Sequence, residues 1–151
     1  MAAEFEGRTA LFRLSQLAAR AMANQGKGVI VNIASIDAYG TFASYSASKA
    51  ALLALTRQAA TELAPSGIRV NSVSPGWTMT AMAVGALTSD ELTTMTTRFD
   101  RVPIQRMITP DEVASAVAYL ASDAVSAVTG TDLVVDGGTL ANLYIIETLN
   151  N

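Results

Sequence analysis

The sequence has 151 residues, 50% of them hydrophobic and 15% charged, with a formal net charge of −3, which predicts one well-buried globular domain over residues 1–151. Cysteine and histidine are both absent, which excludes disulfides, thiolate catalysis and a Ser-His triad, and argues against a metal site. The sequence also lacks a basic block, a long apolar run and a signal peptide, so we expect a cytoplasmic protein without nucleic-acid or membrane partners.

The first predicted element is a helix. Apolar residues recur at helical spacing from Thr9 to about Asn24, and the sequence Gln-Gly-Lys-Gly at 25–28 is typical of a helix stop followed by a turn. Residues 29–33 are mostly β-branched and show no strict alternation. Such a run predicts a strand of a parallel sheet that is covered on both faces.

A second helix and strand follow in the same order. We expect the helix from Ser44, a candidate N-cap, to Ala64, where Pro-Ser-Gly at 65–67 ends it. Residues 68–73 have the same composition as the first strand and predict a second strand of the same kind. The dipeptide Pro-Gly at 75–76 closes that strand with a turn.

A long insert, residues 77–109, precedes the next helix. Within it, Thr88 and Glu91 match a capping box, which predicts a short helix over residues 92–98. We interpret the methionines of the insert as adaptable packing and not as a ligand site; they include Met79, Met82 and Met95. We interpret the charged residues around the short helix as a solvated face; they are Asp90, Glu91, Arg98, Asp100 and Arg101.

A stronger capping box opens the last predicted helix. Thr109 is its N-cap, Pro110 its first residue and Glu112 its third. Residues 133–135, Leu-Val-Val, predict a third short strand. The Asp-Gly-Gly that follows at 136–138 predicts a structural turn.

The predicted order is helix, strand, helix, strand, insert, helix, strand. This alternation predicts an α/β fold with three layers, in which a parallel sheet has right-handed crossovers and helices on both faces. The single domain then consists of strand-helix units at about 9–76, the insert at about 77–109, a last helix and strand at about 110–138, and a tail at 139–151. In such sheets, ligands bind at the carboxyl ends of the strands.

Three polar side chains are expected at that end of the sheet. Ser35 follows the first strand, and Tyr45 and Lys49 stand four residues apart on the second helix, so they share one helix face. A neighbouring ammonium favours the phenolate and lowers the pKa of a tyrosine, which can then exchange a proton near neutral pH. Ser35 is placed to hydrogen-bond the oxygen that Tyr45 protonates. Taken alone, the pair also fits a helix-start aromatic beside a solvated lysine, and Ser35 a loop-capping hydroxyl.

Several motifs occur in a fixed order along the chain. They are Val-Asn-Ile-Ala-Ser at 31–35, Tyr45-x-x-x-Lys49, Ile-Arg-Val-Asn-Ser-Val-Ser-Pro-Gly at 68–76, Thr78 and Thr80, and Val-Val-Asp-Gly-Gly at 134–138. One Tyr-x-x-x-Lys motif is weak, whereas the ordered set in matching strand and helix contexts is specific. The set resembles the C-terminal, catalytic half of the short-chain dehydrogenase/reductase family, and the resemblance extends from about Phe12 to Thr139.

The resemblance implies an NAD(P)-dependent oxidoreductase with a Rossmann-like fold that moves a hydride between nicotinamide and a carbonyl or secondary alcohol. It implies that Tyr45 is the general acid/base and that Ser35 orients and polarises the carbonyl. It also implies that Lys49 lowers the pKa of Tyr45 and hydrogen-bonds the nicotinamide ribose. The residues that it implies for cofactor binding are Tyr45, Lys49, Pro75, Gly76, Trp77, Thr78 and Thr80. The insert would be the substrate loop.

Three features depart from the family's pattern. The ten glycines contain neither G-x-x-x-G-x-G nor G-x-G-x-x-G, so we expect the first βαβ half, which holds the pyrophosphate and selects NAD or NADP, to be missing. Gly7 or Arg8 stands where the family often has a catalytic asparagine. The loop between Ser35 and Tyr45 is a few residues shorter than the family's usual loop.

Two consequences are expected from the missing half. Each lost charge-assisted hydrogen bond to the pyrophosphate weakens cofactor binding by about 1.5–3 kcal/mol. The first strand would also present an open edge, and the apolar helix faces would be exposed to water. Both surfaces can be buried against another copy of the chain, which predicts a homo-oligomer, a dimer or a tetramer. The alternative to an enzyme is therefore a truncated or recombined folding unit without turnover, which self-associates through its apolar helices and open sheet edge.

Other side chains near the motifs receive structural interpretations. We expect Asn71 to be a turn-forming or backbone-bonding amide and Trp77 to pack under the insert. Asp37 and Tyr39 could line the site, but ordinary loop roles are favoured for both.

Overall fold

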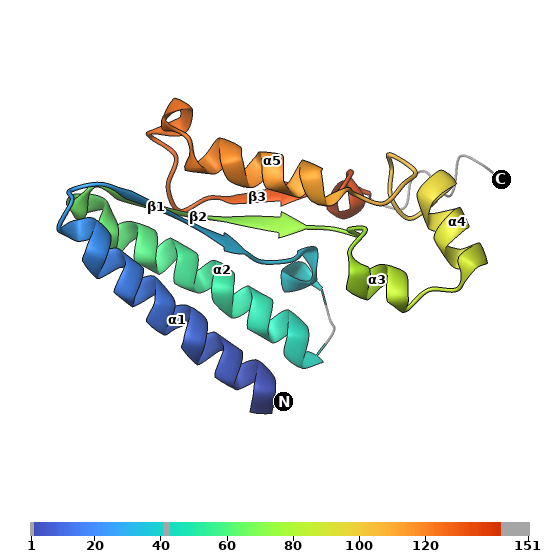
Figure 1. The fold of residues 1–151 in the computed structure, drawn as a ribbon, viewed down its shortest axis with the longest axis horizontal. Coiled ribbons are helices and arrows are strands. Elements are labelled where there is room, and N and C mark those ends of the chain that lie inside the picture. Colours follow the sequence, from blue (N-terminus) through green and yellow to red (C-terminus); the bar gives the residue numbers. More distant parts are fainter. Residues whose placement is uncertain (1, 41–42, 143–151) are drawn as a thin grey trace.

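The computed structural model describes residues 2–40 and 43–142 (Figure 1). The helices are α1 (Ala2–Ala23), α2 (Ala43–Leu63), α3 (Ala81–Gly85), α4 (Ser89–Thr97) and α5 (Pro110–Ala121). The strands are β1 (Gly28–Ile33), β2 (Ile68–Pro75) and β3 (Asp132–Val135). A 3-10 helix, η1 (Ile36–Tyr39), follows β1 directly.

The three strands form one parallel sheet in the order β1-β2-β3. Gly28 of β1 lies opposite Ile68 of β2, and Ser72 of β2 lies opposite Asp132 of β3. β2 is therefore the central strand. Within the described residues β1 has a strand neighbour on one side only, so the expected open edge at the first strand is present there.

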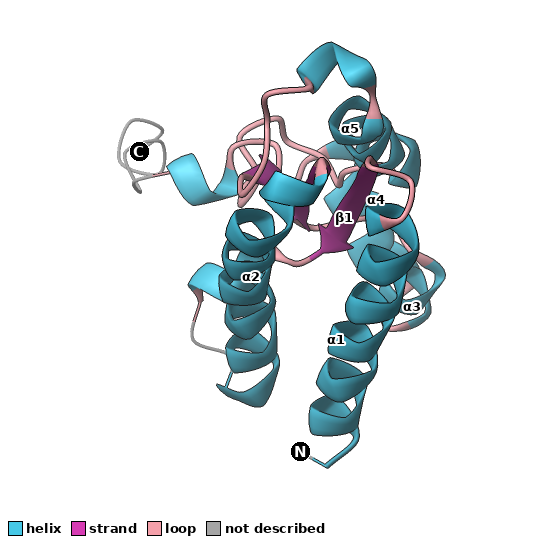
Figure 2. Ribbon diagram, turned by 90° about the vertical axis from the view of Figure 1, so that its left-hand side faces the viewer, coloured by secondary structure: helices cyan, strands magenta, loops and turns pink. Residues whose placement is uncertain are grey.

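Helices cover both faces of the sheet, which confirms the predicted α/β architecture. The helices α1 and α2 lie side by side along one face, and α5 lies along the opposite face (Figures 1 and 2). The insert, with α3 and α4, extends beyond the carboxyl ends of the strands (Figure 1). Among the helices that the structure describes, none combines the length and the apolar character needed to cross a bilayer.

The main core lies between the sheet and the pair of helices α1 and α2. Ile68 and Val70 of β2 are almost completely buried there, and they pack with Ala19 of α1 and Ala60 of α2. Burying one such β-branched side chain contributes about 1.5–3 kcal/mol. Because alanine is small, both helices can approach the sheet closely at these positions.

The prediction that the first two strands are covered on both faces is confirmed, because α1 and α5, which lie on opposite faces of the sheet (Figure 1), both contact β1 and β2. Every residue of β2 is buried or half-buried. Along β1 only Asn32 is buried, and Ile33 at its carboxyl end is 46% exposed. An edge strand has neighbours on one side, and a run of β-branched residues does not distinguish an edge strand from a central one.

The predicted N-cap of the second helix is also wrong. The helix α2 begins at Ala43, so Ser44 is its second residue and is not a cap. The first helix begins at Ala2, well before the predicted start at Thr9.

Both predicted capping boxes are confirmed. Thr88 and Glu91 open α4, and Thr109 and Glu112 open α5, with side-chain and backbone bonds in both directions. The short helix α3 was not predicted. Its N-cap is Thr80, whose hydroxyl accepts the backbone N–H of a residue in the first turn.

The predicted turn after the third strand is confirmed. The carboxylate of Asp136 accepts hydrogen bonds from the backbone N–H groups of Gly138 at 2.8 Å and Leu140 at 2.7 Å. Gly137 and Gly138 have φ angles of 62° and 90°, a region that glycine adopts without steric cost. Residues 143–151 of the predicted tail lie outside the described residues.

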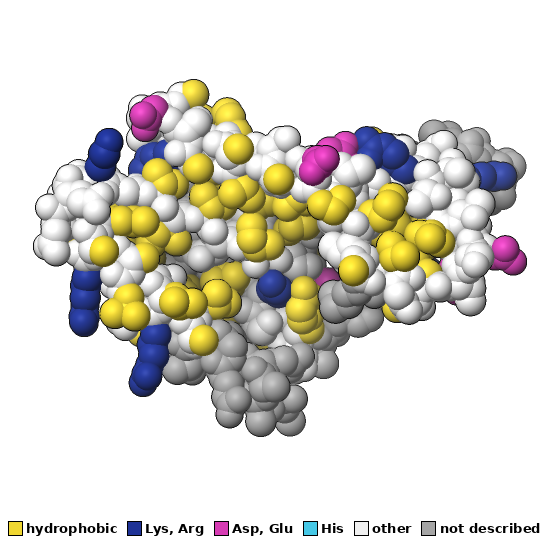
Figure 3. Space-filling view, in the orientation of Figure 1, with side chains coloured by type: hydrophobic (Ala, Val, Ile, Leu, Met, Phe, Trp, Pro, Cys, Tyr) yellow, Lys and Arg dark blue, Asp and Glu magenta, His cyan; other side chains and the backbone are white. Residues whose placement is uncertain are grey.

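Apolar side chains remain at the surface along α1. Figure 3 shows hydrophobic side chains exposed over this helix. Leu14 and Leu17 are 62% and 61% exposed, and Leu11 and Phe12 are both 44% exposed. Four large apolar side chains on one helix form an unusually apolar surface for a helix that faces water.

Candidate active site

All eight predicted site residues line one cavity of about 750 Å³ at the carboxyl ends of β1 and β2. The segment after β1 contributes Ser35, and α2 contributes Tyr45 and Lys49. The last residue of β2 and the segment after it contribute the remaining five: Pro75, Gly76, Trp77, Thr78 and Thr80. Parallel strands end at the same edge of a sheet, which is why residues distant in the sequence meet here.

Ser35 has a fixed position at the start of η1. It is buried, and it is the N-cap of η1, because its Oγ accepts the backbone N–H of Asp37 at 3.1 Å. The same Oγ donates to Asp37 Oδ2 at 3.2 Å. The loop-capping interpretation of Ser35 is therefore correct, and Ser35 lines the cavity as well.

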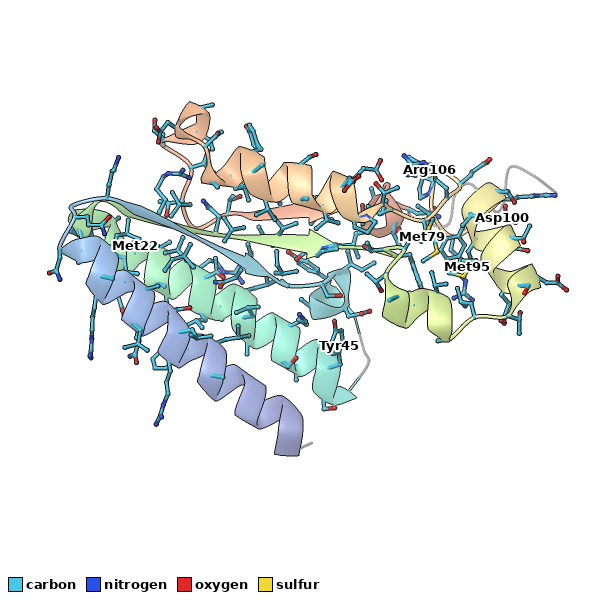
Figure 4. All side chains as sticks on the ribbon, viewed as in Figure 1. Met22, Tyr45, Met79, Met95, Asp100 and Arg106 are labelled. Atoms are coloured by element: carbon cyan, nitrogen blue, oxygen red, sulfur yellow. The ribbon has the colours of Figure 1, made fainter. Side chains whose placement is uncertain are left out.

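Tyr45 and Lys49 lie one turn apart near the start of α2, as their spacing predicts. The Lys49 Nζ atom is 5.6 Å from the centroid of the Tyr45 ring, and Nζ also donates to the Ile33 carbonyl oxygen at 3.0 Å. This bond ties α2 to the end of β1. Tyr45 is 41% exposed, lies near the start of α2 (Figure 4) and lines the cavity.

The electrostatics of the cavity are centred on Lys49. Burial lowers the pKa of Lys49 from its ordinary value of 10.5, and the nearby carboxylate of Asp37 opposes that shift. Desolvation disfavours an ammonium and a neighbouring anion favours it. Lys49 therefore keeps a positive charge near Tyr45 that is partly balanced by Asp37.

The wall after β2 is held rigidly by backbone contacts. The Gly76 N–H donates to the Val135 carbonyl at 2.9 Å, and a Cβ added at Gly76 would lie 2.8 Å from the Asp136 Cα, so this position requires glycine. Thr78 Oγ1 donates to the Gly76 carbonyl at 2.9 Å. The chain thus leaves the sheet along a defined path and then enters α3.

Trp77 has two environments. Its ring contacts the edge of the Phe99 ring, with centroids 5.5 Å apart, so the prediction that it packs against the insert is confirmed. It also lines the cavity and is 42% exposed. Trp77 is the single tryptophan of the sequence, so its fluorescence reports on this cavity.

The insert has a small core of its own beside the cavity. Met79 and Met95 pack against a buried cluster of Phe99, Val102 and Met107 (Figure 4), which confirms their interpretation as packing residues. The Met82 side chain lies outside what the structure describes. Around α4 the charged side chains are exposed, as predicted; Arg98 and Asp100, 3.7 Å apart, are 81% and 73% exposed.

Two further interpretations concern Asn71 and Tyr39. Asn71 is fully buried, and its amide bonds the Val128 carbonyl at 2.9 Å and the Thr131 N–H at 3.1 Å. It is a backbone-bonding residue, as expected. The Tyr39 hydroxyl donates to Asp132 Oδ2 at 2.8 Å, which gives Tyr39 a structural role in anchoring η1 to β3.

Sequence reasoning did not select several residues that line the cavity. Asp37, for which a loop role was favoured, is the polar one and does line the cavity; the apolar ones include Ala83, Met107 and Val113. Asp37 is two residues from Ser35, which is a usable signal. The apolar residues come from the insert and α5, and no local pattern indicates that these segments fold back onto the strand ends.

A second cavity, of about 630 Å³, lies at the opposite ends of the strands, where Met22, Lys27, Arg69 and Asp123 contribute to its lining. The Arg69 guanidinium there donates to three backbone carbonyls, at 2.9–3.1 Å. Three of its five donors therefore hold the end of α5 and the segment that follows it. Among the described residues that line this cavity, no pair of an acid and a base is comparable to Tyr45 and Lys49.

The donor set of the first cavity fits the nicotinamide end of a dinucleotide. One N–H of the Lys49 ammonium is used by Ile33, and an ammonium has three donors, so donors remain for ribose hydroxyls. Tyr45 lines the cavity and is 41% exposed. Apolar wall residues such as Pro75 suit a flat aromatic ring.

Comparison with known proteins gives consistent matches. A family model described as "Enoyl-(Acyl carrier protein) reductase" matches residues 8–139. The chain is 50% identical over 127 residues to cis-4-hydroxycyclohexanecarboxylate dehydrogenase from Sinomonas cyclohexanicum, which covers 82% of this chain and 49% of that protein.

Two solved structures are similar in fold and sequence. One is a gluconate 5-dehydrogenase from Burkholderia cenocepacia J2315 in complex with NADP and tartrate, with a TM-score of 0.78, 31% identity, and coverage of 86% of this chain and 51% of that chain. The other is a 7α-hydroxysteroid dehydrogenase complexed with NADH and 7-oxo glycochenodeoxycholic acid. Its TM-score is 0.75 at 38% identity, and the match covers 84% of this chain and 50% of that chain.

The chain spans about half the length of the relatives it matches. Within that length, the family model covers all eight site residues and the whole sheet. The motifs, the parallel sheet that carries them and the matches agree: the chain belongs to the short-chain dehydrogenase/reductase family.

Proposed function

We propose that the cavity is the catalytic part of an oxidoreductase site that moves a hydride between a nicotinamide cofactor and a carbonyl or secondary alcohol. The observation that carries this proposal is the meeting of Ser35, Tyr45 and Lys49 around one cavity. Relatives named as dehydrogenases, including structures solved with NADH or NADP, support it.

In this proposal Tyr45 is the general acid/base. During carbonyl reduction its phenol gives a proton to the carbonyl oxygen, and during alcohol oxidation the phenolate takes the hydroxyl proton. The Lys49 ammonium, 5.6 Å from the ring centroid, stabilises the negative charge left on the phenol oxygen.

Ser35 orients and polarises the substrate. A hydrogen bond from Ser35 Oγ to the carbonyl oxygen stabilises the negative charge that develops on that oxygen. Ser35 is suited to this role because β1 and η1 fix its backbone on both sides and its side chain is buried at the cavity wall.

The cofactor would be NAD or NADP, which supplies or accepts the hydride when bound. Lys49 would hydrogen-bond the nicotinamide ribose. The wall of Pro75, Gly76 and Trp77 would face the nicotinamide, and Thr78 and Thr80 would face the neighbouring phosphate. These residues hold the cofactor's reactive end.

A titration of the full chain with NADH and with NADPH, followed through Trp77 fluorescence, tests the proposal. We expect saturable quenching by at least one dinucleotide, because Trp77 lines the cavity, and oxidation of that dinucleotide when a ketone is added. Absence of a saturable response to both dinucleotides, or binding without any turnover over a panel of ketones, contradicts the proposal.

A second candidate function belongs to a different class. The chain would be a folding unit without turnover that self-associates, as a dimer or tetramer, through its apolar helices and the open edge of β1. Leu14 and Leu17, more than half exposed on α1, favour it, as does the single strand neighbour of β1 within the described residues. This candidate is supported if neither dinucleotide changes the Trp77 fluorescence and light scattering gives the mass of a dimer or tetramer. Measurable turnover contradicts it.

A further inference from the structure

Asp37 is the one carboxylate among the described residues that line the cavity. It is the second residue of η1 and is half-buried. Lys49 is the other charged residue of that lining, and the attraction between the two groups raises the pKa of Lys49 against the effect of burial. Asp37 therefore faces the region where Ser35, Tyr45 and Lys49 meet.

Asp37 holds the hydroxyl of Ser35 from two directions. The Asp37 backbone N–H donates to Ser35 Oγ at 3.1 Å, and Ser35 Oγ donates to Asp37 Oδ2 at 3.2 Å. A hydroxyl has one proton to donate. While that proton is directed at Asp37, Ser35 cannot donate it to a carbonyl oxygen in the cavity, so Asp37 competes with the substrate for Ser35.

A substrate can remove this competition if it brings a donor of its own. An ionised carboxylate only accepts hydrogen bonds, so a hydroxyl on the substrate can take the place of Ser35 at Asp37 Oδ2. In an α-hydroxy ketone the two oxygens are on adjacent carbons. The carbonyl oxygen can then lie near Ser35 while the hydroxyl lies near Asp37, two groups that already stand within hydrogen-bond distance of each other.

We propose that Asp37 makes this cavity selective for substrates with a hydroxyl next to the reacting carbon, that is, α-hydroxy ketones and the corresponding vicinal diols. The substrate hydroxyl donates to Asp37 and frees the Ser35 proton for the carbonyl. A plain ketone leaves Ser35 bonded to Asp37. A carboxylate at the same place meets a like charge and is disfavoured. The inference rests on the proposed function, because it names the substrate class of the same site.

Binding of two matched ketones to the full chain tests the inference without any dinucleotide. The probes are 2-hydroxycyclohexanone and cyclohexanone, which differ by one hydroxyl next to the carbonyl carbon, and Trp77 fluorescence reports occupancy. We expect the wild-type chain to bind the hydroxy ketone about tenfold more tightly. In Asp37→Asn, which keeps the side-chain size, the ratio should fall to about twofold or less.

Two controls separate Asp37 from its neighbours. Ser35→Ala removes the group that occupies Asp37, so the preference should persist or increase. Asp90→Asn removes a carboxylate from the exposed first turn of α4 and should leave the ratio unchanged. Thermal melting by circular dichroism verifies that each variant is folded.

Four results overturn the inference: equal affinities in the wild type, a preference that survives Asp37→Asn, a preference lost in Ser35→Ala, or no Trp77 response to either ketone. Failure of the proposed function is recognised separately, in the dinucleotide titration. If the chain prefers the hydroxy ketone but shows no turnover, the proposed function is contradicted. If the chain shows turnover but no such preference, only the proposed role of Asp37 is contradicted.

Discussion

Lys49 is the residue on which the cavity's electrostatics depend, and its ionisation can be measured directly. Burial lowers the pKa of Lys49 and Asp37 partly restores it. We therefore expect amine labelling of Lys49 to rise with pH around a midpoint below 10.5. The measurement is the labelling rate against pH by peptide mass spectrometry, and Lys27, the other lysine of the sequence, serves as the internal reference.

The Asp37→Asn variant supplies the matching control for Lys49. Removing the anion takes away the interaction that raises the Lys49 pKa, so the labelling midpoint should move further down. A midpoint that stays in place or moves up in this variant would show that Asp37 does not act on Lys49.

Asn71 illustrates a residue whose role is structural although it lies in a family motif. It is fully buried in β2 and pairs with the Val128 carbonyl and the Thr131 N–H. We expect Asn71→Ala to lower the free energy of unfolding by about 2–4 kcal/mol, because two buried backbone groups lose their partner. Urea denaturation measures the change, and Asn24→Ala, at an exposed turn residue, should change stability by less than about 0.5 kcal/mol.

At the scale of elements, the start of α5 carries the most strongly shifted carboxyl group described. The hydrogen bonds from the Arg106 guanidinium, at 2.7 and 3.0 Å, and from the Thr109 N–H lower the pKa of Glu112 from 4.5 to about 2. A carboxyl group with a lower pKa in the folded chain than in the unfolded one stabilises the fold above pH 4.5. That stabilisation is lost as the pH falls from about 4.5 to about 2.

We therefore expect Glu112→Gln to lower the melting temperature at neutral pH and to flatten its decline between about pH 5 and pH 2. Differential scanning calorimetry at several pH values measures both effects. Asp111→Asn removes a charge from the same first turn and leaves the Arg106 bonds in place, so it controls for the helix dipole. Equal pH profiles for wild type and Glu112→Gln contradict the prediction.

The elements that the sequence predicts well are those with local chemical signals. The capping boxes at Thr88 and Thr109 locate the N-caps of α4 and α5 correctly, because the cap and its partner are three residues apart. The predicted span of the short helix, 92–98, nevertheless begins three residues after the observed start at Ser89. The helix α3 is five residues long and has too few residues for a periodic pattern. The partial exposure of β1 follows from its place at the sheet edge, which is a property of the whole sheet and not of its own residues.

The residues of the candidate site likewise fall into those that a local motif predicts and those that depend on distant contacts. Ser35, Tyr45, Lys49 and the Pro75-Gly76 turn have motif signals, and the parallel sheet brings their strand ends together. The contact between Ser35 and Asp37 depends on the 3-10 turn of η1. The wall formed by Met107 and Val113 depends on how the insert and α5 pack, which involves contacts between residues far apart in the sequence.

At the scale of the whole molecule, the apolar face of α1 predicts self-association. We expect the double variant Leu14→Gln, Leu17→Gln to shift the full chain toward the monomer, because both side chains are more than half exposed and apolar contacts drive such association. Sedimentation velocity over a range of concentrations measures the shift. Tyr119→Ser, at an exposed aromatic on α5, should leave the assembly unchanged, and a wild-type chain that is monomeric at every concentration contradicts the prediction.

The central claim is that Tyr45 transfers the proton in a nicotinamide-dependent reaction within this cavity. The rate of dinucleotide oxidation in the presence of a ketone, compared between wild type and Tyr45→Phe, tests it most directly. We predict a rate about 10²–10⁴-fold lower in Tyr45→Phe, with dinucleotide binding retained, while Tyr119→Phe keeps the wild-type rate. A Tyr45→Phe chain that is folded, binds the dinucleotide and turns over at the wild-type rate would contradict the account.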